Sequence, residues 1–287
     1  MAQQAPSSIQ PQRFESNYPL DPDQIAEWVD LFHRDGFLFL ENVLTEEHVA
    51  QLKADLDWSL ANFAHRNEDE NGKLNSQTAR SSHRLCHRMF EHSQANLNLF
   101  DLEPIVSLAE ALIDEKCHVI HNNSFITPHG GGITTWHQDD PPHYIVTDGK
   151  PPQNVHLPVL AFTCNYYLTD VTKIEHGGTE VIPGSHLIGQ DARQVAKSDE
   201  WPKWEEKIRY NLGKAGSVIM FNNQVWHRGG PNQSDRERYI TQITYGRRFI
   251  GHKYYPFVNY TMPEHVYRDA DPRLKRLVGF LNHGAYG

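Results

Sequence analysis

The sequence predicts an α+β chain in which helices come first and short β-strands follow. Two segments near the N-terminus, within residues 21–36 and 45–66, place apolar side chains at helical spacing. From His118 onward, short runs rich in β-branched and aromatic residues alternate with turn residues. This order of elements favours a mainly β core, a sandwich or a barrel, with a shell of helices formed by the N-terminal part.

The first helix is predicted within residues 21–36. Asp21 is a suitable N-cap, and Pro22 fits the first turn, where its missing N–H is not needed. Gly36 is expected to end the helix, and an apolar strand within residues 37–44 is expected to follow. The apolar stripe of this helix consists of Ile25, Trp28, Val29 and Phe32.

A second helix is expected to begin at Thr45 and to end near Arg66, and a polar surface loop follows at 67–82. A third helix is predicted within 102–115. The stripe of the second helix consists of Val49, Leu52, Leu56 and Leu60. The expected strands lie within 118–126, 155–168, 179–185, 216–222 and 238–246. A partly helical insertion at 186–208 and a terminal helix within 263–284 complete the prediction. With no internal repeat, we expect one domain over 1–287 that begins with an irregular arm at 1–20.

Composition excludes several classes of function. The chain has 287 residues and a formal net charge of −9, whereas nucleic acids and anionic membranes select basic surfaces. No run is long and apolar enough for a membrane span, and no secretory signal is evident, so a cytoplasmic location is expected. The three cysteines, Cys86, Cys117 and Cys164, form no CxxC pair, so we expect free thiols rather than a disulfide framework.

A histidine and an aspartate stand two residues apart in the stretch WHQD at 136–139. On a β-strand, residues i and i+2 point to the same face, so His137 and Asp139 would project together. Both side chains are ligands for a metal such as Fe(II). A lone pair of this kind is nonetheless better interpreted as the solvated end of a strand, so a third ligand is needed.

His227 is the best candidate for that third ligand. It follows the apolar run 218–221, precedes a turn built from residues 229–232, and is followed by a strand that begins at Arg238. Two histidines and one carboxylate form the facial set of ligands of non-haem Fe(II) oxygenases, which leaves three metal positions open. A buried arginine is costly unless it meets an anion, and its planar fork suits a carboxylate.

Together these features resemble the phytanoyl-CoA dioxygenase family of Fe(II)/2-oxoglutarate-dependent oxygenases. The matching stretches are DGFLFLENVL at 35–44, WHQD at 136–139, HGGTEVIPGSH at 176–186 and HRGGPNQSDRERY at 227–239. The resemblance implies a double-stranded β-helix (a cupin-like jelly roll) with iron bound by His137, Asp139 and His227. It also implies that Arg238, helped by Thr179, holds the distal carboxylate of 2-oxoglutarate.

The chain departs from the family pattern at two positions. His176 replaces the asparagine that usually opens the middle motif, which weakens the assignment of Thr179. Gly229 replaces a small hydroxyl residue two positions after the distal histidine, which removes one hydrogen bond to the cosubstrate.

The resemblance implies an enzyme that uses Fe(II), 2-oxoglutarate and O2 to hydroxylate an unactivated C–H bond of a small organic metabolite, with release of succinate and CO2. Asp139 disfavours halogenation, while desaturation, epoxidation, ring expansion and endoperoxide formation stay open. Two other functions also stay open: a non-catalytic jelly roll that binds a small ligand, and a cupin-like metalloenzyme that uses no 2-oxoglutarate. The intact set of ligands with its arginine favours the enzyme over the non-catalytic protein.

For the other conspicuous polar residues, a structural or surface role is expected rather than a role in the site. His186 and His176 are expected in turns, and Asp140 is expected to point away from any metal. His143 has a smaller claim to line the mouth of a site. The stretch HRLCHR at 83–88 is interpreted as a solvated helix start rather than as a source of cations for an anionic ligand. Core packing is the expected role of most of the neighbouring aromatic residues, Trp136, Tyr144, Tyr166, Tyr167 and Trp226.

Overall fold

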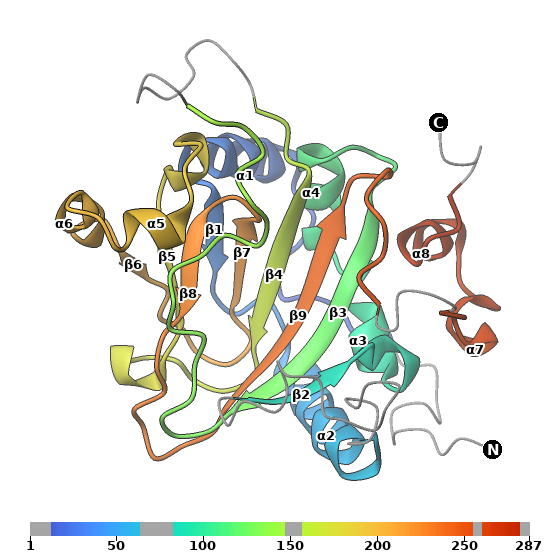
Figure 1. Cartoon of the computed structure of the whole chain (residues 1–287). Helices are drawn as coiled ribbons and strands as arrows, with labels where there is room; N and C mark the ends of the chain where they lie inside the picture. Colours follow the sequence, from blue (N-terminus) through green and yellow to red (C-terminus); the bar gives the residue numbers. More distant parts are fainter. Residues whose placement is uncertain (1–12, 64–82, 147–156, 255–259, 282–287) are drawn as a thin grey trace.

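Two antiparallel sheets form the centre of the molecule in the computed structural model of the chain, which describes residues 13–63, 83–146, 157–254 and 260–281 (Figure 1). The larger sheet has the strand order β1-β7-β4-β9-β3-β2, and the smaller one has the order β6-β5-β8. The strands are β1 Phe37–Leu40, β2 Arg84–His87, β3 His118–Thr127, β4 Ala161–Tyr167, β5 Thr179–Ile182, β6 Arg209–Tyr210, β7 Val218–Asn222, β8 Trp226–Gly229 and β9 Arg238–Gly246.

The longer helices lie in the N-terminal half, as the sequence predicted. The α-helices are α1 Pro22–Asp35, α2 Glu46–Phe63, α3 Gln94–Asn98, α4 Ile105–Leu112, α5 Ala192–Val195, α6 Trp201–Glu205, α7 Glu264–Tyr267 and α8 Pro272–Leu277. Three short 3-10 helices are η3 Met89–Glu91, η4 Ile174–His176 and η5 Ser185–Leu187. No helix in the described ranges combines the length and the apolar character that a membrane crossing needs.

The predicted boundaries of helix α1 are confirmed, and both predicted caps form. The Asp21 side chain accepts hydrogen bonds from the backbone N–H groups of Asp23 at 3.0 Å and Gln24 at 3.4 Å. Gly36 adopts the left-handed conformation at φ 81°, and its N–H donates to the Phe32 carbonyl. The buried side of the helix then packs on the larger sheet, where the rings of Phe32 and Phe162 lie 5.5 Å apart.

The two faces of the larger sheet have different neighbours. Along β4, Phe162, Cys164 and Tyr166 point to the outer face, where they share a hydrophobic core with the buried side chains of α1 and α4. The next residue in each case points to the inner face, and there Tyr167 packs with apolar residues of β7 and β5. Helices thus cover one face of the larger sheet, and the inner face is left for a site.

Several expectations need correction. Residues 84–87 form strand β2, paired with β3, and not the start of a helix. Arg84 is exposed, Leu85 and His87 are half-buried and only Cys86 is buried, which suits a sheet edge, and the partner strand lies far away in the sequence. Helix α3 was not predicted, although Ser93 caps it through a hydrogen bond from the Asn96 N–H. The predicted terminal helix is two helices, α7 and α8.

Other expectations are confirmed or lie outside the described residues. The strand predicted within 37–44 forms as β1, the five predicted from His118 onward form as β3, β4, β5, β7 and β9, and the insertion at 186–208 is partly helical. All three cysteines are buried free thiols, as expected. The predicted loop at 67–82, the end of the second helix near Arg66 and the first part of the arm, 1–12, lie outside the described ranges. Of the rest of the arm, Ser16 forms a β-bridge with Leu44.

Candidate metal centre

His137 and His227 face each other across an isolated antiparallel β-bridge. The His137 N–H donates to the His227 carbonyl at 3.0 Å, and the His227 N–H donates back at 2.8 Å. Two residues further on, the Asp139 N–H donates to the carbonyl of Asn223 at 2.9 Å. The expected strand around His137 is therefore only a bridge, yet the extended backbone still places residues i and i+2 on one side.

Gln138 shows that this alternation holds. Its side chain points away from the pair and is satisfied by the backbone of the insertion, since its Oε1 accepts from the Ala192 N–H at 2.9 Å. Its Nε2 donates to the Gln190 carbonyl at 3.2 Å. The insertion thus helps to hold the loop that carries His137 and Asp139.

The three side chains converge on one point. His137, Asp139 and His227 each offer a ligand atom, and these atoms all lie within 4.8 Å of one another. The Nδ1–H of His137 donates to the Thr135 carbonyl at 2.8 Å, and the Nδ1–H of His227 donates to the Val225 carbonyl at 2.9 Å. These bonds fix the tautomers, so that the Nε2 lone pairs are free for a metal.

The protonation states suit a cation. Burial, followed by the nearby His227, lowers the pKa of His137 to about 4, so this imidazole is neutral near pH 7. Partial burial acts to raise the pKa of Asp139, but His227 and His137 outweigh it and lower the pKa. The Asp139 side chain stays 31% exposed, and its Oδ1 lies 3.5 Å from the Nε2 of His227. A neutral His137 imidazole and the Asp139 carboxylate are therefore available together beside the His227 ring.

His227 reaches this position by a different route from the expected one. It does not lie at the end of β7; the chain turns after Asn222, and His227 lies on β8, in the smaller sheet. There it opposes Val181 of β5, and its ring packs on Phe221 with a centroid distance of 4.4 Å. The centre therefore lies between the two sheets.

Arg238 begins β9 on the inner face and is almost completely buried, with 4% of its surface exposed. Its Nη1 donates to the Gly230 carbonyl and its Nη2 donates to the Thr127 hydroxyl, both at 3.2 Å, while its Nε has no partner. Among the described residues no carboxylate lies within ion-pair distance of it. Burial lowers the pKa of Arg238 to about 10, which leaves the guanidinium charged at neutral pH. A buried charge without a counter-ion fits a site for an anion.

Thr179 lies near this guanidinium at the start of β5. Its hydroxyl accepts a hydrogen bond from the Asn165 side chain at 3.3 Å, and its N–H donates to the Tyr167 hydroxyl at 3.1 Å. It opposes Gly229 across the β5–β8 pair. The hydroxyl hydrogen can still be donated to a ligand, so Thr179 is compatible with the expected role but does not contact Arg238 through any hydrogen bond in the described residues.

The other predicted polar residues lie outside the ligand set. His186 is buried and lies within 3.1 Å of the His33 carbonyl. The Asp140 carboxylate accepts from the Asn223 side chain at 3.3 Å, and His143 lies 3.5 Å from the same amide. Sequence reasoning missed Asn223, whose backbone positions Asp139; only its place at a strand end marks it.

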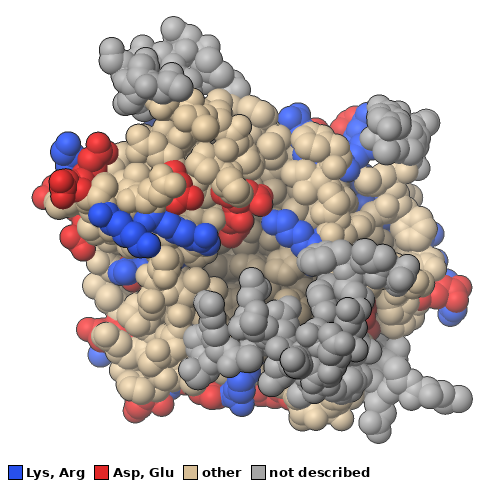
Figure 2. All heavy atoms as spheres, in the orientation of Figure 1, with Lys and Arg blue, Asp and Glu red and all other residues tan. Residues whose placement is uncertain are grey.

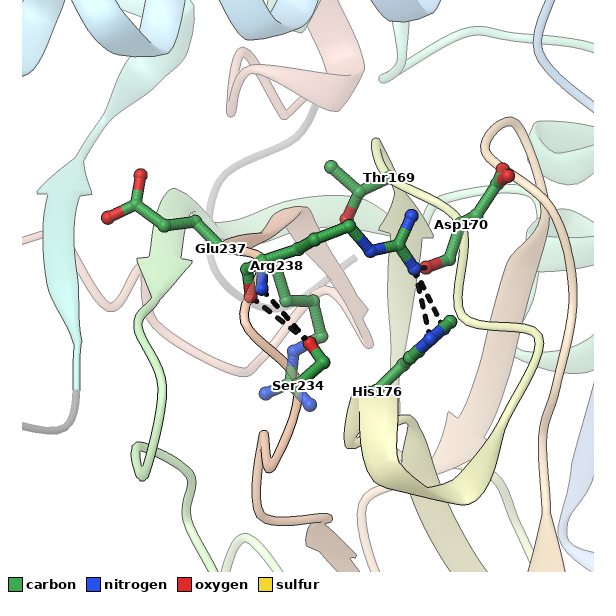
Figure 3. A pocket seen from close by; sticks show the side chains of 7 residues that line it. Thr169, Asp170, His176, Ser234, Glu237 and Arg238 are labelled. Atoms are coloured by element: carbon green, nitrogen blue, oxygen red, sulfur yellow. Dashed lines mark hydrogen bonds between the residues drawn. The ribbon is translucent and has the colours of Figure 1, made fainter.

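His176 lies in a small surface pocket, shown in Figure 3. Its ring nitrogens lie 3.0 Å from the Nη2 of Arg236, and its Nδ1 accepts from the Thr172 N–H at 3.2 Å. His176 is therefore occupied by local contacts in a turn, as expected. The lining of the pocket is Thr169, Asp170, His176, Ser234, Arg236, Glu237 and Arg238.

Comparisons with known proteins point in one direction. The sequence model of the phytanoyl-CoA dioxygenase family matches residues 32–240. The ectoine dioxygenase of Bordetella bronchiseptica is 26% identical over 230 residues, which cover 73% of this chain and 71% of that protein. The ectoine dioxygenase of Nocardia farcinica is 27% identical over 229 residues, which cover 72% of each.

Solved structures share the fold at low sequence identity. HygX from Streptomyces hygroscopicus, solved with nickel and 2-oxoglutarate bound, has a TM-score of 0.61 at 14% identity over 82% of this chain and 90% of its own. The epimerase SnoN from nogalamycin biosynthesis, in complex with Fe3+, α-ketoglutarate and nogalamycin RO, has a TM-score of 0.60 at 19% identity. That match covers 80% of this chain and 86% of the other.

Proposed function

The chain belongs to the phytanoyl-CoA dioxygenase family, and on that premise we propose that it is an Fe(II)- and 2-oxoglutarate-dependent oxygenase. The observation that carries the proposal is the convergence of His137, Asp139 and His227, whose ligand atoms lie within 4.8 Å of one another. The buried Arg238 without a counter-ion supports the use of an acidic cosubstrate.

The described residues fit the proposed metal. His137 and His227 would bind Fe(II) through Nε2, because both Nδ1 atoms already donate to backbone carbonyls. Asp139 would supply the one anionic ligand. Two imidazoles and one carboxylate leave three positions of the metal for cosubstrate and O2. When bound, iron with 2-oxoglutarate and O2 supplies an oxidant strong enough to attack an unactivated C–H bond.

The chain's own residues would orient the cosubstrate. Arg238 would pair with the distal carboxylate of 2-oxoglutarate through its guanidinium, whose Nε has no partner within the described part of the chain. Thr179 would donate its hydroxyl hydrogen to the same carboxylate. Both side chains are buried, so water is largely excluded from this end of the site.

We infer hydroxylation of a small organic metabolite as the reaction, with release of succinate and CO2. An epimerase is among the proteins that share the fold, so the fold by itself does not fix the reaction. The two antiparallel sheets with the centre between them support a jelly roll. Helices α1 and α4 pack on the larger sheet, which supports the proposal of one domain over 1–287.

The test is metal-dependent turnover of 2-oxoglutarate. We expect Asp139→Ala to weaken Fe(II) binding by more than about 100-fold and to abolish succinate formation, because the anionic ligand of the set found among the described residues is lost. Calorimetric metal titration and succinate assays measure the two effects. Asp30→Ala, which removes an exposed carboxylate on α1, is the matched control and should behave like the wild type.

The same assays separate the other candidate functions. A cupin-like enzyme would consume O2 without forming succinate, and a non-catalytic binding protein would consume neither O2 nor 2-oxoglutarate. The proposal would be refuted if the metal-loaded protein gave either of these results with every substrate tried and if Asp139→Ala kept the wild-type metal affinity.

A further inference from the structure

The inner face of the larger sheet carries a row of residues that leads away from the metal centre. Phe221 opposes Thr163, Thr163 opposes Thr244, and Thr244 opposes His121 across three successive strand pairs. Directly opposed residues point to the same face of a sheet. Phe221 packs on His227 at a centroid distance of 4.4 Å, so the whole row, His121 included, faces the space beside the metal centre.

The neighbouring row on the same face is also polar. It runs from Asn165 through Gln242 and Asn123 to His87, again by direct opposition. The inner part of this row is satisfied within the protein: Gln242 donates to Asn165 at 2.9 Å, and Asn165 donates to Thr179 at 3.3 Å. These bonds give Gln242 and Asn165 a structural role.

At the outer end of the two rows, polar side chains lack hydrogen-bond partners among the described residues. The rings of His87 and His121 lie 6.3 Å apart, and neither ring makes a hydrogen bond to any residue in the described part of the chain. Beside them, the Oδ1 of Asn123 has no partner, although this residue is only 7% exposed. The buried Oδ1 of Asn123 thus lacks the partner that buried polar groups in proteins normally have. The two half-buried imidazoles beside it offer ring nitrogens without partners among the described residues to the same space, and together these groups indicate a ligand.

Lys253 adds a positive charge to this group. The backbone N–H of Lys253 donates to the Ile120 carbonyl at 2.6 Å, which places the Lys253 backbone beside the part of β3 that carries His121. Burial, then His87 and Lys253, lower the pKa of His121 to about 4, and the charge of Lys253 also acts on Asp139. No carboxylate of the described residues lies within ion-pair distance of Lys253.

This group is separate from the proposed 2-oxoglutarate clamp. Arg238 and Thr244 are six residues apart on β9, which corresponds to roughly 20 Å along a strand. Arg238 therefore lies at one end of the inner face, and His121, which opposes Thr244, lies at the other. Figure 2 shows a hollow near the middle of the view, over β4 and β9 as they lie in Figure 1.

We propose that His87, His121 and Lys253 form the substrate-binding end of the site, and that they select a small molecule with a carboxylate or phosphate group. This inference rests on the proposed function. The oxyanion pairs with the ammonium group of Lys253 and accepts hydrogen bonds from the two neutral imidazoles. With Asp139 holding iron and Arg238 holding the cosubstrate, Lys253 would still have no carboxylate partner among the described residues. Anchoring there places the rest of a short substrate against the metal.

Binding to the protein loaded with Ni(II) and 2-oxoglutarate tests the inference without turnover. The probes are matched pairs: short carboxylic acids with their primary amides, and alkyl phosphates with their alcohols, titrated by calorimetry at constant ionic strength. We expect the best anionic members to bind at least about tenfold more tightly than their neutral partners. Lys253→Met should remove that preference, and His121→Leu should reduce it. Lys116→Met, at an exposed turn, is the control and should keep the preference.

The outcomes distinguish this inference from the proposed function. Metal and 2-oxoglutarate binding are measured first for each variant, and their absence in the wild type would overturn the proposed function itself. If both bind, equal affinity for acids and amides overturns the inference alone, as does a preference that survives in Lys253→Met. Preference for carboxylates over phosphates, or the reverse, identifies which oxyanion the site takes.

Discussion

At the scale of single residues, the burial of an unpaired charge has a free-energy cost that a bound anion would offset. Arg238 is the clearest case, because a charged guanidinium lies buried with two neutral acceptors and no anion among the described residues. Desolvation of such a charge costs several kcal/mol at the order-of-magnitude level. The chain retains it at the head of an inward-facing strand, which is expected of a binding residue and not of a structural one.

Replacing Arg238 by leucine should separate ligand binding from stability. We expect 2-oxoglutarate affinity to fall by more than about 100-fold, because the ion pair is lost. The free energy of unfolding without ligand should stay equal or rise, because an unpaired buried charge is removed. Calorimetry and urea unfolding measure the two quantities. Arg209→Leu, which removes an exposed guanidinium on β6, should leave both unchanged; a similar loss of affinity there would contradict the assignment.

At the scale of elements, the turns between strands set the position of the site residues more than the strands themselves do. The turn before β5 brings Gly177 against both the Arg238 side chain and the β8–β9 connection. Its φ is +73°, and a Cβ there would lie 2.6 Å from the Gly230 carbonyl oxygen and 2.8 Å from the Nη1 of Arg238. Only glycine permits so close an approach in this conformation.

Gly177→Ala should therefore damage the site through the turn. We expect a loss of stability of about 2 kcal/mol or more, and a higher KM for 2-oxoglutarate, because Arg238 must move. Gly130→Ala is a matched control, since Gly130 has a φ of +75° but nothing within 4 Å of an added Cβ. The control should show only the backbone strain, of about 1 kcal/mol, with an unchanged KM. Equal effects of both changes on KM would show that crowding at Arg238 is not the cause.

At the scale of the whole molecule, several histidines outside the proposed ligand set are buried. Burial lowers the pKa of His48 and of His186 to about 4, and each lies near a backbone carbonyl, of Ala95 and of His33 respectively. An unfolded histidine has a pKa near 6.5, so between about pH 6.5 and 4 the unfolded chain binds more protons than the folded one. Stability is therefore expected to fall as the pH drops through this window.

Each such histidine adds up to about 1.4 kcal/mol of destabilisation per pH unit in that window. Urea unfolding of the metal-free protein at about pH 7 and about pH 5 measures the drop. His48→Gln, which can still donate to the Ala95 carbonyl, should reduce the drop, while the exposed His129→Gln should not. An equal drop in all three proteins would refute the role given to His48.

Local patterns were sufficient to predict much of the fold and to single out most residues of the candidate site. The caps of α1, the apolar runs of β4, β7 and β9, and the arginine at the head of β9 were all readable, because each depends on neighbours in sequence. The pair His137 and Asp139 was readable for the same reason, since two residues apart on extended backbone means one side of the chain.

Other features depend on partners far away in the chain, and no local pattern reveals them. Residues 84–87 form a strand only because β3 offers an edge, and His227 meets His137 only because the chain crosses to the smaller sheet after β7. The group formed by His87, His121 and Lys253 likewise arises from register between separate strands. The sequence by itself determined the caps of α1, the apolar strands from His118 onward and the shared side of His137 and Asp139. The tertiary structure alone decided which of them share one space, because strand pairing and packing are long-range and their energies are collective.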